Sequence, residues 1–279
     1  RVFHWFYFSL EMRETDVLLR LGAYLLFRKY NMIIPPKLMG STGKERMDEQ
    51  TLEDVIAKVK PALNEVDEYL TIIMYASIGT IQYSVEDFYR SHGTIQSQDG
   101  VPTYVTDKHI TCIGMVDHGS LLEDEAIQNL KQRIDTFDRY SIRTSNMYLM
   151  SWVYVQQTSR NEASTSKLKR SSIIKPDIED LADSGNPSKS AEVVMAIFNP
   201  ARYNMPNYLG YDITERGLHE SQRFVWILKG RFIPEGCVPC AFYGETGTFV
   251  KLPRLNDLPL DRDKDQLYLS IKQRRYAYR

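Results

Sequence analysis

The stretch VFHWFYFSLEM, residues Val2–Met12, decides the fold more than any other part of the chain. Its first residues are nearly all apolar or aromatic, which is typical of a strand in a parallel sheet, and Glu11 follows at its end. A second apolar run, Cys112–Val116, is followed directly by Asp117. The carboxyl ends of parallel strands meet at one edge, where one carboxylate can serve a magnesium ion and the other a water molecule. The pair therefore predicts a site for nucleotide hydrolysis.

Composition limits the alternatives. The chain has 279 residues, of which 43% are hydrophobic and 25% charged, so it can bury a full core and is neither disordered nor fibrous. Its formal net charge of −1 means that any contact with nucleic acid must come from local loops or from assembly. The apolar run at the start is too short for a membrane span and lacks the form of a signal peptide. Because Arg1 lies inside an expected core strand and no methionine precedes it, we expect a segment upstream.

Three cysteines, Cys112, Cys237 and Cys240, are too few for a disulfide framework. The spacing of Cys237 and Cys240 matches half of a zinc site, but the chain offers no second pair. We therefore expect three plain strand thiols in a reducing cytoplasm.

Apolar periodicity predicts alternating strands and helices in the first half of the chain and hairpins in the last part. Helices are expected over Val17–Leu25, from Thr51, and over Ala126–Phe137; strands over Tyr69–Met74, Met150–Gln157, Ala191–Phe198, Phe224–Leu228, Val238–Tyr243 and Thr248–Leu252. Ser84–Asp87 resembles the capped start of a short helix, Gln96–Gly100 a surface insertion, and Ser159–Ser172 a mobile loop. The pattern predicts an α/β domain with a mostly parallel sheet, flanked by helices, and an antiparallel hairpin at its C-terminal edge.

The pair Gly43-Lys44 resembles the central Gly-Lys of a phosphate-binding loop motif. That motif needs glycine five residues before the pair and serine or threonine after it, whereas the chain has Leu38 and Glu45 there. A solvated turn accounts for the pair. If the chain is an ATPase, its phosphate loop is expected upstream of Arg1 or in another chain.

Six motifs carry a family resemblance through their order and spacing. They are Phe8–Met12, Met115–Asp117, Val155–Arg160, Asp180–Gly185, Ala191–Met195 and Lys229–Arg231. Together they resemble the carboxyl-terminal RecA-like ATPase domain of DnaB-type replicative helicases, in a divergent form expected of a phage or plasmid. The resemblance covers almost the whole chain. It implies a RecA-like motor domain over residues 1–254, incomplete at its start, and a charged tail over residues 255–279.

The resemblance also implies roles for the residues of a hydrolysis site. Glu11 would polarise the water that attacks the γ-phosphate, and Asp117 would bind the nucleotide cofactor by holding Mg²⁺ through water. Gln157 would sense the γ-phosphate, and Lys229 and Arg231 would reach the ATP of the adjacent subunit. Where the family has a tyrosine and a glutamine after the aspartate, this chain has His118-Gly119-Ser120, which leaves polar coupling through that loop unsupported.

Two loops would contact single-stranded DNA. Asp183, Ser184 and Gly185 lie where the family lines its central channel, and backbone amides there can bind phosphates without reading sequence. The family commonly has arginine at the position of Ala182, and a basic group nearby could replace that contact. That group consists of Lys167, Lys169 and Arg170, which a solvated loop explains nearly as well.

The implied function is that of a replicative DNA helicase with ATP, or another NTP, and Mg²⁺ as cofactors. Its expected partners are single-stranded DNA, copies of itself in a hexameric ring, and a primase or helicase loader. Its expected location is the cytoplasm of a bacterium or an infected host. Two alternatives stay open. One is a recombinase-like or clock-type ATPase that assembles without unwinding, and the other is a catalytically inactive ring component.

Overall fold

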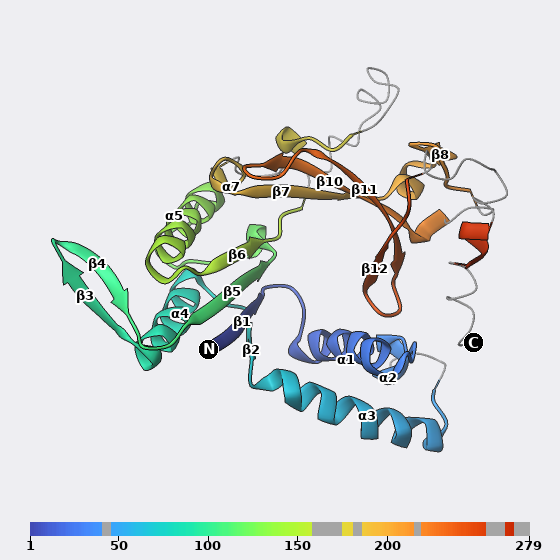
Figure 1. Ribbon diagram of the computed structural model, residues 1–279, viewed down its shortest axis with the longest axis horizontal. Helices are drawn as coiled ribbons and strands as arrows, with labels where there is room; N and C mark the ends of the chain where they lie inside the picture. Colours follow the sequence, from blue (N-terminus) through green and yellow to red (C-terminus); the bar gives the residue numbers. More distant parts are fainter. Residues whose placement is uncertain (41–45, 158–174, 181–185, 215–218, 255–265, 271–279) are drawn as a thin grey trace. The chain divides into compact units, whose positions relative to one another are not determined.

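The computed structural model describes residues 1–279 except 41–45, 158–174, 181–185, 215–218, 255–265 and 271–279 (Figure 1). The chain divides into two compact units, which are described separately. Unit 1 comprises residues 1–18, 61–160 and 179–191. Unit 2 comprises residues 19–60, 161–178 and 192–279.

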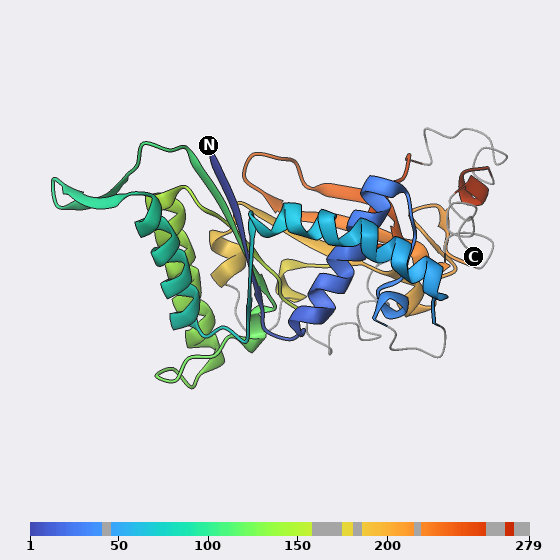
Figure 2. The same cartoon turned by 90° about the horizontal axis from the view of Figure 1, so that it is seen from below.

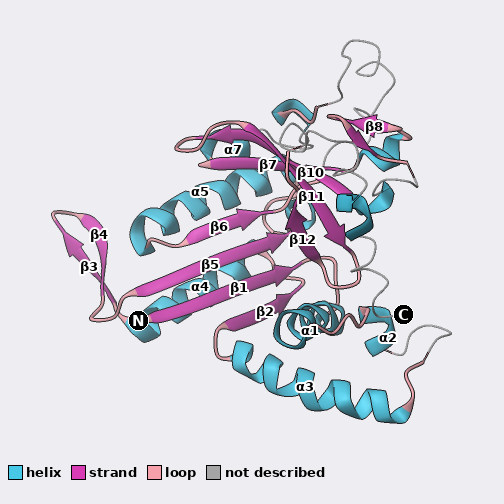
Figure 3. Ribbon diagram, turned by 45° about the vertical axis from the view of Figure 1, so that its right-hand side comes forward, coloured by secondary structure: helices cyan, strands magenta, loops and turns pink. Residues whose placement is uncertain are grey.

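Unit 1 contains a four-stranded sheet in the order β2-β1-β5-β6, and every neighbouring pair of strands is parallel (Figure 3). Its strands are β1 (Val2–Ser9), β2 (Leu70–Met74), β5 (Ile110–Asp117) and β6 (Ser151–Tyr154). The strand β1 is central and is paired on both sides, and its side chains Phe6 and Phe8 are buried in the core. The parallel sheet expected from the sequence is therefore confirmed.

Two helices, α4 (Ile78–His92) and α5 (Leu130–Tyr148), lie side by side on one face of this sheet (Figures 1 and 2). The buried side chains of β1 on that face, Phe6 and Phe8, belong to the same core as the apolar stripes of the two helices. Tyr89 of α4 stacks on Tyr148 of α5 with ring centroids 4.0 Å apart. This core holds the strands whose ends carry the acidic residues.

Two local expectations for unit 1 are wrong. Ser84 does not begin a helix: α4 begins at Ile78, Ser77 is the cap that accepts a hydrogen bond from the Thr80 amide, and the Ser84 hydroxyl donates to a carbonyl inside the helix. Ala126 precedes the long helix instead of belonging to it, because Asn129 caps α5.

The expected surface insertion at Gln96–Gly100 is part of a β-hairpin formed by β3 (Thr94–Gln98) and β4 (Val101–Val105). Asp99 and Gly100 both have positive φ in the turn, which is the conformation that an Asp-Gly pair favours in two-residue hairpins.

Unit 2 contains an antiparallel sheet in the order β12-β11-β10-β7. Its strands are β7 (Val193–Phe198), β10 (Gln222–Gly230), β11 (Gly236–Tyr243) and β12 (Thr248–Lys251). All four were expected from their apolar runs. They pair with one another and form a sheet of their own, since no ladder joins them to the parallel strands among the described residues.

The other described elements are short or helical. They are α1 (Glu14–Tyr30), α2 (Pro36–Met39), α3 (Glu49–Asp67), α7 (Asn186–Ser190), β8 (Asn207–Tyr208), β9 (Tyr211–Asp212) and the 3-10 turns η1 (Gly119–Leu121), η2 (Ile178–Asp180), η3 (Pro200–Tyr203) and η4 (His219–Ser221). The helices expected around Val17 and from Thr51 are thereby confirmed. Tyr268, in the segment expected to be a tail, is buried in the core of unit 2. In the described part of the chain, none of the helices has the length and apolar character of a membrane span.

The three cysteines are free thiols on strands, as expected. Burial raises the pKa of Cys112 to about 11 and that of Cys237 to about 12. Both groups are therefore protonated and unreactive near neutral pH.

Candidate active site

The carboxyl edge of the parallel sheet is fixed by main-chain hydrogen bonds that continue past the strands. The Leu10 amide donates to the Asp117 carbonyl at 2.8 Å, and the Tyr75 amide donates to the Ser9 carbonyl at 2.9 Å. In the ladder between β1 and β5, Ser9 is paired with Asp117. The chain segments that follow both strands therefore begin at the same edge of the sheet, as their sequences predicted.

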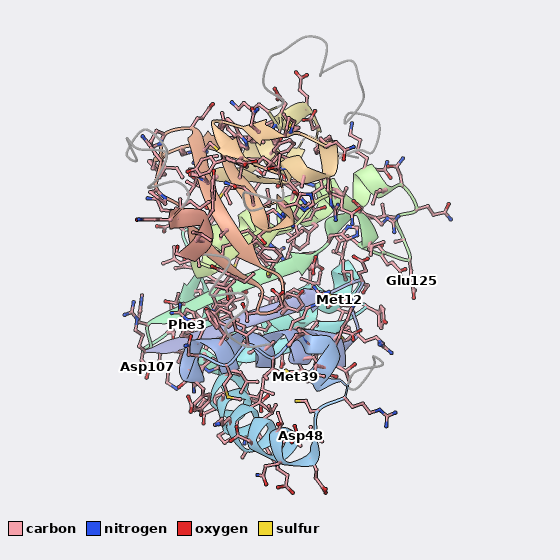
Figure 4. All side chains as sticks on the ribbon, turned by 90° about the vertical axis from the view of Figure 1, so that its right-hand side faces the viewer. Phe3, Met12, Met39, Asp48, Asp107 and Glu125 are labelled. Carbon is pink, nitrogen blue, oxygen red and sulfur yellow. The ribbon has the colours of Figure 1, made fainter. Side chains whose placement is uncertain are left out.

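Glu11 is presented by a tight turn at the end of β1. The fully buried Ser9 hydroxyl accepts a hydrogen bond from the Met12 amide at 3.2 Å and donates to the Met12 carbonyl at 3.0 Å. Figure 4 shows Met12 and Glu125 near the carboxyl end of this sheet, and Phe3 and Asp107 near its amino end. The turn leaves the Glu11 side chain 60% exposed, so its carboxylate can reach a bound substrate or water.

Asp117 is held by a residue of the neighbouring strand. The Tyr7 hydroxyl donates to Asp117 Oδ2 at 2.7 Å, and both side chains are half-buried. A carboxylate oriented in this way keeps one oxygen engaged and the other available to a ligand.

His118 joins the other polar groups of this edge. Its side chain is 11% exposed, and its Nε2 lies 3.6 Å from Glu11 Oε2 and 3.3 Å from Gln157 Nε2. Gln157 follows β6, whose end is tied to β5 because the Val155 amide donates to the Val116 carbonyl at 3.0 Å. The structure thus brings Glu11, Asp117 and Gln157, all expected from sequence, to one edge.

Gly119 allows this loop to approach β6. Its amide donates to the Val155 carbonyl at 2.8 Å, and a Cβ at this position would overlap the ring of Tyr154. Glycine is required here because of that close approach and not because of its backbone angles.

The donor set of this edge fits a magnesium ion better than a transition metal. No group of three or more His, Cys, Asp or Glu side chains with the geometry of a metal site occurs among the described residues. Magnesium is usually held by one or two carboxylates while substrate phosphates and water supply its other ligands, and Asp117 can serve as that carboxylate.

Lys229 and Arg231 belong to unit 2. Lys229 lies near the end of β10, after a bulge. Arg231 lies one residue beyond the end of the strand, and the Arg231 amide donates to the Glu192 carbonyl at 2.8 Å. The Arg231 guanidinium also forms an ion pair with the Glu192 carboxylate at 2.6 Å. Both side chains are more than half exposed, so the arginine is accessible from solvent.

The expected DNA contacts lie outside the described residues. They are Lys167, Lys169, Arg170, Asp183, Ser184 and Gly185. Their roles, like those of the groups at the sheet edge, stay predictions.

The sequence interpretation missed two residues of this edge. Tyr7 appeared only as one of many aromatic residues in β1, although its alternation with the buried Phe6 and Phe8 places it on the other face. His118 was treated as a departure from a family pattern, and its position directly after Asp117 is the signal that could have identified it.

No family model matches the chain, and no curated protein sequence matches it. Solved structures do match. One is described as the ATPase domain of G40P, with a TM-score of 0.64 and 20% identity over 90% of this chain and 75% of the other. Another is described as a DnaB-like replicative helicase and its interactions with primase, with the same TM-score and identity over 90% of this chain and 52% of the other. This chain therefore spans about half the length of the second protein. The similarity shows that the chain has the fold of DnaB-like helicase ATPase domains.

Proposed function

We propose that this chain is the motor domain of a ring-forming DNA helicase that hydrolyses ATP, or another NTP, between its protomers. The observation that carries the proposal is the meeting of Glu11, Asp117 and Gln157 at one carboxyl edge of a parallel sheet. Two carboxylates of different exposure suit two tasks there. The exposed one can orient a water molecule, and the one held by Tyr7 can bind a cation.

When bound, Mg²⁺ would neutralise charge on the phosphates, and Asp117 would hold it through water. Glu11 would orient the attacking water, and Gln157 would donate from its amide to the γ-phosphate. Positioning and electrostatic stabilisation account for catalysis of this kind, because the protein forms no covalent intermediate in it.

Arg231 is proposed to act on the nucleotide of a neighbouring protomer, with Lys229 beside it. Its ion pair with Glu192 does not oppose this role, since exposed pairs contribute only about 0–1 kcal/mol. The guanidinium can therefore exchange Glu192 for a phosphate group, to which it can donate two parallel hydrogen bonds.

The DNA-binding part of the proposal rests on two loops. Residues 183–185 would bind phosphates of single-stranded DNA through the backbone, and the basic residues of 167–170 would add charge. By analogy with the helicase whose interactions with primase were studied, a primase or a loader would be the protein partner.

The test is nucleotide turnover by the full-length protein with and without single-stranded DNA. Glu11→Gln should reduce turnover by about a hundredfold or more while nucleotide binding persists. Glu125→Gln, at another exposed acid of unit 1, is the matched control and should leave turnover unchanged. Turnover that does not depend on Glu11 or is insensitive to DNA would refute the motor, and an assembly role would then be the better account.

Mixing two inactive variants tests the action of Arg231 between protomers. Arg231→Ala should itself reduce DNA-stimulated turnover by about a thousandfold. In an equal mixture of Arg231→Ala and Glu11→Gln, about one interface in four combines an intact Glu11 with an intact Arg231, so turnover should reappear. If the variants assemble together and turnover stays at the level of the separate proteins, Arg231 does not act between protomers.

A further inference from the structure

The loop that joins β10 to β11 presents an aromatic side chain to solvent. Phe232, the residue after Arg231, is 85% exposed, which makes it the most exposed large apolar side chain among the described residues, and Ile233 beside it is 41% exposed. Apolar surface of this kind is unfavourable in water and becomes favourable when a partner covers it. An exposed aromatic residue next to an arginine is also a combination that anchors many protein–protein contacts.

The turn around Phe232 has a defined shape. The Arg231 amide donates to the Glu192 carbonyl at 2.8 Å, which ties the start of the loop to the neighbouring strand. At Gly230 a Cβ would overlap the Ile233 carbonyl, so the loop folds tightly back on itself around Phe232. A ring that projects from a fixed turn loses little conformational freedom when it is bound, and this favours its use as an anchor.

Unit 1 exposes apolar side chains of its own at the carboxyl edge of the parallel sheet. Tyr75, directly after β2, is 66% exposed, and Leu121 in η1 is 40% exposed. Their two segments are neighbours, because a parallel bridge joins Ser77 to Glu123, two residues further along each segment. Tyr75 has a φ of 51°, a backbone conformation that is rare for a bulky residue and is more common at functional sites. Tyr75 and Leu121 are called the edge patch.

The edge patch lies beside the acids of the candidate site. The Tyr75 amide donates at 2.9 Å to the carbonyl of the last β1 residue, two positions before Glu11. Residues 10–13 and 117–125, which lie at this edge, include five acids and a single arginine. Residues 229–235 of the β10–β11 loop instead include two cations and one acid. The cationic loop with its apolar tip is therefore complementary to the acidic edge with its apolar patch.

We propose that Phe232 is the anchor through which one copy of this chain docks on the next, by packing against Tyr75 and Leu121 of that neighbouring copy. Such a contact joins two different surfaces, so it repeats from copy to copy and can close into a ring. The inference rests on the proposed function and deepens it, because the contact would carry Arg231 to the edge where the neighbour's Glu11 lies. A second copy is the partner that fits, since this chain supplies both of the complementary surfaces.

Removing the aromatic ring should weaken assembly and leave the fold intact. Phe232→Ala should raise the protein concentration at which half of the copies are assembled by about tenfold or more, measured by sedimentation with Mg²⁺ and a non-hydrolysable ATP analogue. Urea unfolding of the dissociated protein should not change, because the side chain is exposed there. Leu269→Ala removes another exposed apolar side chain of unit 2 and is the matched control. If Phe232→Ala assembles like this control, the inference is overturned.

Two charged substitutions test whether the loop faces an acidic surface. Phe232→Asp and Phe232→Lys remove the same ring and differ in the charge that replaces it. Acids on the opposite copy should repel aspartate and attract lysine, so Phe232→Asp should assemble at least about tenfold more weakly than Phe232→Lys at low salt. Equal assembly of the two variants at low salt would show that the acidic edge is not opposite Phe232, and would overturn the inference.

Cross-linking between chains identifies the surface that Phe232 contacts. Phe232→Cys and Tyr75→Cys are made in separate chains, and their mixture is treated with a short bis-maleimide. A covalent dimer should form in this mixture, but not in either variant alone or in the natural protein. A mixture of Phe232→Cys with Tyr83→Cys, at an exposed position on α4, should also give none. Equal dimer formation in both mixtures, or cross-linking only when both cysteines are in one chain, would overturn the inference.

The mixing experiment with Arg231→Ala and Glu11→Gln separates this inference from the proposed function. If the Phe232 contact is found and mixing restores no turnover, the copies dock as inferred and only the action of Arg231 between protomers fails. If mixing restores turnover while Phe232→Ala assembles like the natural protein, only the docking inference fails.

Discussion

Replacing Tyr7 by phenylalanine removes one hydroxyl group and tests how Asp117 is held. The Tyr7 hydroxyl donates to Asp117 Oδ2 at 2.7 Å, an ordinary distance for an O–H···O bond. A hydrogen bond to a charged group contributes about 1.5–3 kcal/mol, and because both side chains are only half-buried here we expect the loss to be about 1–2 kcal/mol. The ring itself remains, so packing is retained.

The same substitution should weaken the binding of magnesium. Loss of a residue that orients a ligand usually lowers metal affinity by about 10–100-fold, and we expect the lower end because Asp117 supplies only one of the ligands. The concentration of Mg²⁺ that gives half-maximal turnover should therefore rise about tenfold, with kcat nearly restored at saturating Mg²⁺.

Urea denaturation and a Mg²⁺ titration of turnover measure the two effects. Tyr83→Phe is the matched control, because Tyr83 is 72% exposed on α4 and should tolerate the change. If Tyr7→Phe matches this control in both assays, the hydrogen bond does not orient Asp117, and the assignment of this aspartate to magnesium loses its structural support.

Three further predictions concern other parts of the molecule. Gly119→Ala should lower the free energy of unfolding by about 2–3 kcal/mol in urea denaturation, because the added methyl group would overlap Tyr154, and an unchanged value would contradict that contact. Burial lowers the pKa of His4 below its ordinary value of 6.5, so the unfolded chain binds this proton first. The free energy of unfolding should fall as the pH drops below 6.5, and His4→Gln should flatten that part of the curve; the same slope in both proteins would exclude His4 as its source. Glu192→Gln should raise the turnover that depends on Arg231 by no more than about fivefold, because an exposed ion pair contributes at most about 1 kcal/mol. A large loss of turnover would show that Glu192 has a role of its own.

The parallel sheet and the positions of both acids could be predicted from sequence because buried strands have a strong signal. In β1 and β5 an apolar run ends in an acid, and strand ends of a parallel sheet must share an edge. Glu11 and Asp117 followed from this rule alone. The antiparallel strands were also predictable, since their apolar runs are separated by turn residues.

The misplaced helix start shows what sequence patterns leave open. Ser77 and Ser84 both precede residues that suit a first helical turn, and only packing decides between them. The buried stripe of α4 already begins at Ile78, so Ser77 is the cap and the Ser84 hydroxyl bonds within the helix. Local capping signals compete, and the longer apolar stripe prevails.

The contacts of His118 and Tyr7 could not be predicted for a different reason. Each depends on a residue more than thirty positions away, and the distances are set by the register of β1, β5 and β6. No local sequence pattern predicts that Tyr7 and Asp117 lie on the same face of the sheet, or that Gln157 lies beside His118. Tertiary pairing determines these contacts.

The main-chain bonds at the carboxyl edge bear on how this sequence can diverge. The Leu10 amide donates to the Asp117 carbonyl, and the Tyr75 amide donates to the Ser9 carbonyl. Both hydrogen bonds use main-chain atoms only, so they can form with any side chain at these positions, except that proline cannot replace the two donor residues. Most substitutions near the edge therefore leave its framework intact. Two chains can therefore share this fold while most of their side chains differ, as 20% identity at a TM-score of 0.64 illustrates.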